Sequence, residues 1–389
     1  MRTALLLALL GTVGCVDGGG GDNDTGDPNG KADSGDEQTI AVGGQRLRRI
    51  APRPMAPADQ AKVDTFMGGF LAAPVTDFRT QAAAEVGIDL AVTDVAGEPV
   101  RLGSVAYLRP GLGNIAPSPA DVFLLARHFD TLVVLYTNTT DASGDASVRR
   151  VTEIAGVTIP DRIAGEVNIF AIGSPQFNLI TSTQQSDVTL EQLQQLHDAS
   201  TLVGFDALEE PAWIFAHSQG SIDAVLTDDR LRDAGFAGFD HIVTIGAALE
   251  GGRLIRSGIG ASWISGALAA AGTQGATAME ALAPDLVAGT LTGLLGVTTE
   301  QELASVLAER ITFSFAGAID TTAPKGNVRD AFLFLAGQAD GAGRIDPSDG
   351  VVSTTSALKG GFTKSYPQTD HVLLIEDPAL LADMLSELD

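Results

Sequence analysis

Short apolar runs, many of them rich in β-branched and aromatic residues, recur along the chain from residue 40 onward. Continuous apolar runs of this length are typical of strands that helices bury on both faces. Helical patterns with a plausible N-cap, such as Ser118–Phe129 and Thr189–Ser200, lie between some of them. This alternation predicts an α/β domain with a mostly parallel central sheet flanked by helices. The predicted strands are residues 87–95, 103–109, 131–137, 166–172, 212–216, 240–246 and 330–337.

Residues 251–312 depart from this alternation, because they contain no strand pattern and are rich in Ala, Gly, Leu and Ser. This composition predicts several short, loosely packed helices inserted between the strands 240–246 and 330–337. Two interpretations of the insertion remain open. It consists either of ordinary helices that cover the sheet or of a mobile helical cap over a functional site.

The N-terminal residues predict export. Residues 1–14 contain one basic residue, an apolar run and then small residues, which is typical of a signal peptide and too short to span a membrane. The ending TVGC resembles a bacterial lipoprotein signal, so we expect Cys15 to be lipidated and to anchor the protein to a membrane of the cell envelope. Simple secretion is the alternative. Residues 15–39 nearly lack large apolar side chains and predict a flexible tether, after which residues 40–389 are expected to form the α/β domain.

The charge of the chain narrows the range of partners. Asp and Glu number 49 against 24 Lys and Arg, which gives a formal net charge of -25. Such an acidic chain is repelled by the phosphates of nucleic acids, so we expect no nucleic-acid partner. Cys15 is the only cysteine, and no intramolecular disulfide can form.

The segment Ile214–Asp223, IFAHSQGSID, places a serine between a predicted buried strand and a stretch with helical spacing. This context is typical of a nucleophile elbow, whose strained turn requires small residues two positions before and after the serine. Ala216 and Gly220 occupy these positions. We therefore expect Ser218 to be a nucleophile and the backbone N–H of Gln219 to stabilise an oxyanion. The alternative role of the serine is an ordinary helix N-cap after a core strand.

A serine nucleophile needs a base that is held by an acid. Among five histidines, His371 is the candidate base, because it follows a loop and precedes an apolar run near the C-terminus. Asp349, in SDGVVS, is the candidate acid, and Asp340 and Asp346 are the alternatives. The resulting order of serine, acid and histidine along the chain is that of α/β-hydrolases. The other histidines are expected within helices, at a strand start or beside the serine; they are His128, His197, His241 and His217.

Four stretches of the chain, FAHSQG, IVTIGAALEGG, SDGVVSTTSALKG and TDHVLL, resemble the bacterial true lipases of the α/β-hydrolase superfamily. The resemblance covers residues 212–371 in patches. It implies a catalytic triad of Ser218, Asp349 and His371, the last two of which are 22 residues apart. It also implies the α/β-hydrolase fold.

The chain departs from the family in its oxyanion loop and its metal site. The family's H-G signature is absent, and Leu108 to Gly111 is the preferred region for the second oxyanion donor, with residues 135–141 as the alternative. The family's calcium site uses an aspartate where position 373 is leucine. We therefore expect no metal, and the resemblance implies no other cofactor.

These observations together predict an exported, lipid-anchored serine hydrolase of α/β-hydrolase fold. Its predicted substrates are lipids or other carboxylic esters with an apolar acyl chain. A polyester depolymerase or an amidase could use the same triad. A catalytically silent lipoprotein that uses the fold for surface binding is the alternative from another class.

Overall fold

The computed structural model describes most of the chain from residue 100 to residue 388. The described ranges are residues 38–42, 45–49, 100–111, 119–136, 147–154, 157–159, 167–173, 180–256, 258–319 and 347–388, with isolated residues between them. Several predicted features lie outside these residues: the signal and Cys15, most of the tether, residues 88–95 of the first predicted strand, and the alternative acids Asp340 and Asp346.

An eight-stranded sheet forms the centre of the molecule, in the order β12-β11-β10-β9-β3-β4-β8-β5. Every pairing in it is parallel except that of β5 with β8, so the predicted α/β class with a mostly parallel sheet is confirmed. The strands are β3 (Gly103–Arg109), β4 (Phe129–Leu135), β5 (Arg149–Arg150), β8 (Asn168–Ile172), β9 (Ala212–His217), β10 (Phe239–Ile245), β11 (Phe313–Ala318) and β12 (Phe362–Pro367).

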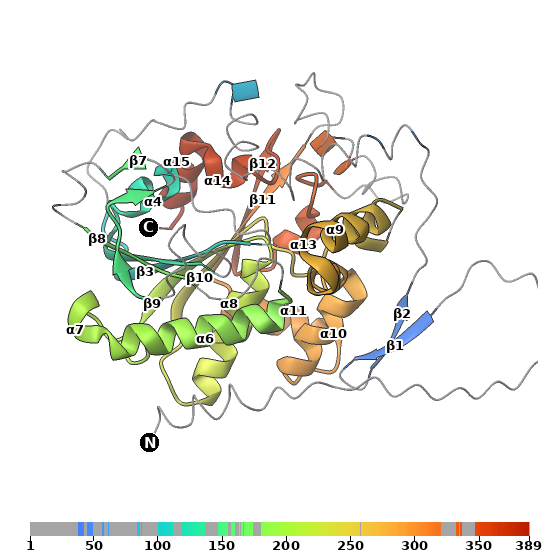
Figure 1. Cartoon of the computed structure of the whole chain (residues 1–389), viewed down its shortest axis with the longest axis horizontal. Coiled ribbons are helices and arrows are strands. Elements are labelled where there is room, and N and C mark those ends of the chain that lie inside the picture. Colours follow the sequence, from blue (N-terminus) through green and yellow to red (C-terminus); the bar gives the residue numbers. More distant parts are fainter. Residues whose placement is uncertain are drawn as a thin grey trace, which may run out of the picture.

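Helices cover both faces of this sheet (Figure 1). In the central strand β9, alternate residues point to opposite faces, with Ile214 and Ala216 in one apolar cluster and Trp213 and Phe215 in the other. The first cluster includes residues of α6 (Ser182–Asp198), α8 (Gly220–Asp233), α10 (Pro284–Leu294) and α11 (Glu300–Arg310). The second includes residues of α4 (Pro119–Leu125), α14 (Leu373–Glu376) and α15 (Pro378–Ser386).

Five predicted strands are confirmed within two residues at each end, as β3, β4, β8, β9 and β10. The predicted strand 330–337 is wrong, because Phe332, Leu333, Leu335 and Ala336 are helical. A short apolar run does not distinguish a strand from a buried helix. Three strands of the sheet were not predicted, and one of them is the two-residue strand β5. The other two are longer. These are β11, which contains Gly317, and the edge strand β12, whose residues are largely polar and partly exposed.

The insertion between β10 and β11 is helical, but less fragmented than expected. It contains η2 (Arg253–Arg256), α9 (Gly258–Glu280), α10 and α11, and α9 alone has 23 residues. Buried side chains such as Trp263 and Leu291 join the same apolar cluster as α6 and α8. Leu268 and Leu294 point outward and are 52% and 44% exposed. The short helix α13 (Thr354–Ala357) follows β11 in the chain.

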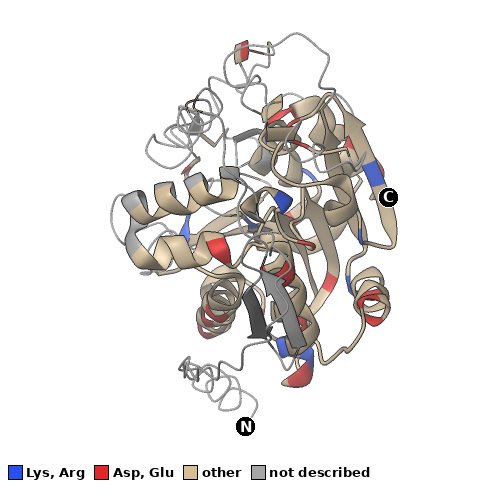
Figure 2. Ribbon diagram, turned by 90° about the vertical axis from the view of Figure 1, so that its right-hand side faces the viewer, with Lys and Arg blue, Asp and Glu red and all other residues tan. Residues whose placement is uncertain are grey.

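The remaining described elements are short. They are β1 (Gln38–Val42), β2 (Gln45–Arg49), β6 (Glu153–Ile154), β7 (Val157–Thr158) and α7 (Ser200–Val203). In the part of the chain that the structure describes, no helix is both long and apolar enough to cross a membrane. Figure 2 shows acidic positions on several helices and loops, and the described Lys and Arg in this view form no continuous band.

Candidate active site

Ser218 occupies the sharp turn between β9 and α8, at the carboxyl edge of the sheet. Its φ angle is +55°, and among the described non-glycine residues only Gln368 also has a positive φ. The amide of Ser218 donates to the carbonyl of Ile245, the last residue of the neighbouring strand β10, at 3.0 Å. The serine carbonyl accepts from the amide of Ser221 at 3.1 Å. This strained turn, held by its neighbours, presents a partly exposed serine at the start of a helix.

The turn is possible only because its neighbours are small. A Cβ on Gly220 would lie 2.6 Å from the carbonyl oxygen of Pro110. A Cβ on Gly111 would lie 2.6 Å from Cβ of Ser218. Ala216 is fully buried within β9. The chain that leaves β3 therefore rests directly on the turn, and glycine is required on both sides of the contact.

Asp349 and His371 form a buried hydrogen-bonded pair. Nδ1 of His371 lies 2.6 Å from Oδ2 of Asp349, and the backbone amide of His371 donates to the carbonyl of Asp349 at 3.0 Å. The other carboxylate oxygen accepts from the amides of Val351 and Val352 at 2.9 and 2.7 Å. Because Oδ2 of Asp349 is the acceptor in this hydrogen bond, Nδ1 of His371 is the donor, and Nε2 is then the acceptor nitrogen of the ring.

The imidazole of His371 lies next to the turn that holds Ser218. Gly246 directly follows Ile245, and a Cβ on Gly246 would lie 3.2 Å from Nδ1 and from Cε1 of His371. The described hydrogen bonds include none between Ser218 Oγ and His371. Such bonds are often long before substrate binds and tighten in the complex. The three predicted triad residues therefore lie at the carboxyl edge of the sheet, Ser218 directly after β9, His371 after β12, and Asp349 in the chain between β11 and β12.

The two candidate oxyanion regions differ in their distance from the serine. Gly111, at the end of the segment Leu108 to Gly111, touches Ser218, and the loop that continues from it lies outside the described residues. The alternative segment 135–141 begins at Leu135 and is described only to Tyr136. The carbonyl of Leu135 accepts from Arg109, and that of Tyr136 accepts from Gln192. Of the two, only the first segment is seen in contact with the serine.

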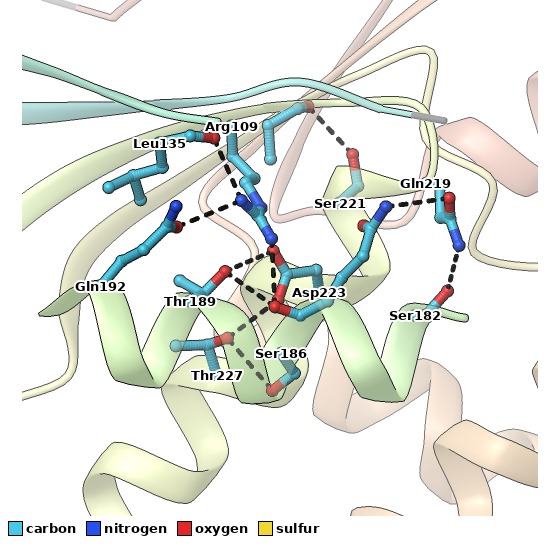
Figure 3. Close-up of polar contacts among 12 residues, drawn as sticks. Arg109, Leu135, Ser182, Ser186, Thr189, Gln192, Gln219, Ser221, Asp223 and Thr227 are labelled. Carbon is cyan, nitrogen blue, oxygen red and sulfur yellow. Dashed lines mark hydrogen bonds and ion pairs between the residues drawn. The ribbon is translucent and has the colours of Figure 1, made fainter. Parts of the chain in front are cut away.

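A fully buried ion pair between Arg109 of β3 and Asp223 of α8 lies behind the turn (Figure 3). It was not predicted, because its members are 114 residues apart in the chain. Burial lowers the pKa of the Arg109 guanidinium, and the neighbouring Asp223 carboxylate opposes this shift. Arg109 also donates to the carbonyls of Leu135 and Gln185. Asp223 accepts from the hydroxyls of Thr189 and Thr227. The pair thus joins the strand that precedes Gly111 to the helix that follows Ser218.

The side chain of Gln219 extends this network to α6 (Figure 3). Its Oε1 accepts from Nε2 of Gln185 at 3.0 Å. Its Nε2 donates to the carbonyl of Ile180 at 3.0 Å and lies 3.3 Å from Oγ of Ser182. The side chain therefore anchors the turn to the start of α6, while the backbone N–H of Gln219 belongs to the free N-terminal end of α8.

The remaining histidines take other places. His128 and His197 hydrogen-bond to the carbonyl of Val100 and to Asp206, away from the serine. His241 lies at the start of β10, at the opposite edge of the sheet. His217 was set aside as a mere neighbour of the nucleophile, but its Nε2 lies 3.1 Å from the backbone carbonyl oxygen of His371. Among the described residues there is no cluster of His, Cys, Asp and Glu that could hold a metal ion.

The molecule combines three features. It has a mostly parallel sheet with helices on both faces, a serine with positive φ at a strand-to-helix turn, and a His–Asp pair later in the chain. This is the α/β-hydrolase fold. The feature that decides the assignment of the fold is the strained turn at Ser218 between β9 and α8.

Comparison with known proteins gives distant structural matches only. No family model and no curated protein sequence matches the chain. A Bacillus licheniformis lipase, BlEst2 in its mature form, matches with a TM-score of 0.45 and 13% identity, over 76% of this chain and 96% of that chain. A thermostable esterase from Pseudomonas putida matches with a TM-score of 0.35 and 13% identity, over 86% and 98%. Esterase B from Lactobacillus Rhamnosis matches with a TM-score of 0.33 and 12% identity, over 86% and 95%. Any statement about activity therefore rests on the site itself.

Proposed function

We propose that this protein is a serine hydrolase that cleaves carboxylic esters with an apolar acyl chain. The observation that carries the proposal is the buried His371–Asp349 hydrogen bond, which lies against the same turn that holds Ser218. An α/β fold needs no such arrangement for stability, since a buried acid and histidine beside a strained serine cost free energy. The same three groups are what acyl transfer requires.

The chemistry follows from the positions of the atoms. Nε2 of His371 takes the proton of Ser218 Oγ as that oxygen attacks the ester carbonyl, and it then gives the proton to the leaving alcohol. Asp349 holds the imidazole with its proton on Nδ1 and stabilises the imidazolium that forms. The acyl-serine is hydrolysed by a water that His371 activates in the same way.

The negative charge on the carbonyl oxygen forms beside the N-terminal end of α8. The backbone N–H of Gln219 is the first oxyanion donor in this proposal, and the positive end of the helix dipole adds to it. The second donor in this proposal comes from the segment Leu108 to Gly111, because Gly111 lies against the serine.

The apolar surroundings support an apolar acyl group. A cavity whose walls are almost entirely apolar lies next to the site, between the sheet and the α4–α15 layer. Pro110 and His217, which directly precede Gly111 and Ser218, form part of its wall. Its other lining residues include Leu108, Phe215, Ile245, Ile375 and Leu385.

Two assays on the domain from Ile40 onward test the proposal. Wild-type protein should react with a fluorophosphonate probe, which requires an activated serine, and should hydrolyse p-nitrophenyl esters of several acyl lengths. Ser218→Ala and His371→Ala should each lower kcat by about 10^4–10^6-fold, and the double variant should be hardly worse. Ser305→Ala, at an exposed position of α11 outside the described site, is the matched control and should keep its activity.

The results also separate the alternatives. A protein that does not react with the probe and does not turn over is a silent binding protein, and the proposal is then wrong. Reaction with the probe together with hydrolysis of anilides or polyesters, but not of simple esters, would point to an amidase or a depolymerase.

A further inference from the structure

His217 contacts both the nucleophile and the base of the proposed triad, although it is not itself a member of the triad. It is the last residue of β9, directly before Ser218, and it is 5% exposed. Its Nε2 reaches the backbone carbonyl oxygen of His371, 154 residues further along the chain, at 3.1 Å. A carbonyl oxygen accepts only, so Nε2 of His217 is the donor and carries a proton.

The two imidazoles also touch. Their ring centroids are 4.6 Å apart, with the ring planes at 40°. His371 is thereby held from several directions: Asp349 binds its amide and its Nδ1, Gly246 packs against its ring, and His217 binds its carbonyl.

Unlike the contacts of Asp349, the contact of His217 with His371 connects the base directly to the segment that carries Ser218. Asp349 fixes the orientation of the His371 ring, but it lies just before α13 and has no contact with Ser218 that the structure describes. His217 is covalently joined to Ser218 and hydrogen-bonded to the main chain of His371. It is therefore the shortest described link between the segment that carries the nucleophile and the loop that carries the base.

We infer that His217 is a positioning residue of the triad, whose Nε2–H sets the distance between Ser218 Oγ and Nε2 of His371. The inference rests on the proposed function. Proton transfer depends steeply on this distance, and a misplacement of about 1 Å can cost about 10^2-fold in rate. A histidine that only filled space in the core would be replaceable by any side chain of similar size.

Two substitutions of similar size separate these roles. His217→Gln places an amide N–H about where Nε2 of the imidazole lies, so the hydrogen bond to the His371 carbonyl is kept. His217→Met fills the space without a donor. We expect His217→Met to lower kcat by about 10–100-fold with KM within about 2-fold, and His217→Gln to stay within about 3-fold of wild type. His241→Met, at the far edge of the sheet on β10, is the control for the substitution itself and should leave kcat unchanged.

A second readout does not depend on turnover. In the Ser218→Ala background, the downfield proton resonance of the His371–Asp349 hydrogen bond reports directly on the held imidazole. It should remain sharp with His217→Gln and should shift or broaden with His217→Met. If His217→Met does not fold, His217→Asn takes its place, because its shorter amide does not reach the carbonyl.

Wild-type kcat in the donorless variant, or equal losses in both variants, would overturn the inference while leaving the proposed function intact. An unchanged resonance in the donorless variant would overturn it as well. If the wild-type protein neither turns over nor reacts with the probe, the proposed function fails, and the positioning role fails with it.

Discussion

Replacing Ser218 by glycine and, separately, by alanine distinguishes the strain of the turn from the loss of the hydroxyl. Both variants lack Oγ and should be inactive. Alanine keeps a Cβ at a φ of +55°, which costs about 1–2 kcal/mol in the left-handed region. Glycine avoids that cost but loses about 0.5–1 kcal/mol more conformational entropy on folding than alanine. We therefore expect Ser218→Gly to be more stable than Ser218→Ala by about 0.5–1 kcal/mol.

The same pair of substitutions at Ser221 provides the control. Ser221 lies in the first turn of α8 and is not among the residues with positive φ. Glycine should therefore be the less stable variant there, by about 0.5–1 kcal/mol. Urea unfolding of the four variants measures both differences. If the glycine variant is not the more stable one at Ser218 while the Ser221 pair behaves as expected, the turn stores no backbone strain and the reasoning is refuted.

Three further predictions concern other parts of the molecule. Arg109→Met leaves Asp223 buried without a counter-charge and should lower the free energy of unfolding by about 3–5 kcal/mol; the double variant with Asp223→Leu should regain much of it in the same denaturation assay. Cys15→Ser should abolish palmitate labelling and membrane association of the native protein, and mature wild-type protein that lacks Cys15 would show simple secretion instead. Hydrogen bonds from Lys364 and from a tyrosine lower the pKa of Asp383, so the folded state binds fewer protons than the unfolded state. The resulting stabilisation is present at pH 7 and is lost as the pH falls below about 4, so the melting temperatures of wild type and Asp383→Asn should differ at pH 7 and converge near pH 3.

The sequence allowed the central strands and the place of the serine to be predicted, because both depend on local patterns. A buried apolar run followed by helical spacing identifies a strand-to-helix turn, and small residues at 216 and 220 fit it. Asp349 and His371 emerged as candidates from chain order and loop context, and the structure places them in direct contact. The alternatives Asp340 and Asp346 lie outside the described residues.

The features that the sequence did not reveal depend on long-range contacts. In the sequence, Arg109 is a charged residue at the end of a predicted strand. None of its neighbours in the sequence indicates that Asp223 will lie beside it in the core. His217 was set aside because its neighbour in the chain is the serine, whereas its partner in space is far along the chain. The strand 330–337 was misassigned for a different reason: a short apolar run suits a buried helix as well as a strand, and only its packing in the folded protein distinguishes them.

The glycines around the triad limit which positions can vary in a library of mutants. At Gly111, Gly220, Gly246 and Gly317 an added Cβ would meet Ser218, the main chain of Pro110, the ring of His371 or the Cβ of Asp349. These contacts involve backbone or the side chains of Ser218, Asp349 and His371, and Gly246 also has a positive φ. Saturation mutagenesis scored for turnover should therefore leave these four positions almost unchanged. New substrate preferences should come from the walls of the neighbouring cavity, which contain side chains such as Leu108, Phe215 and Ile375.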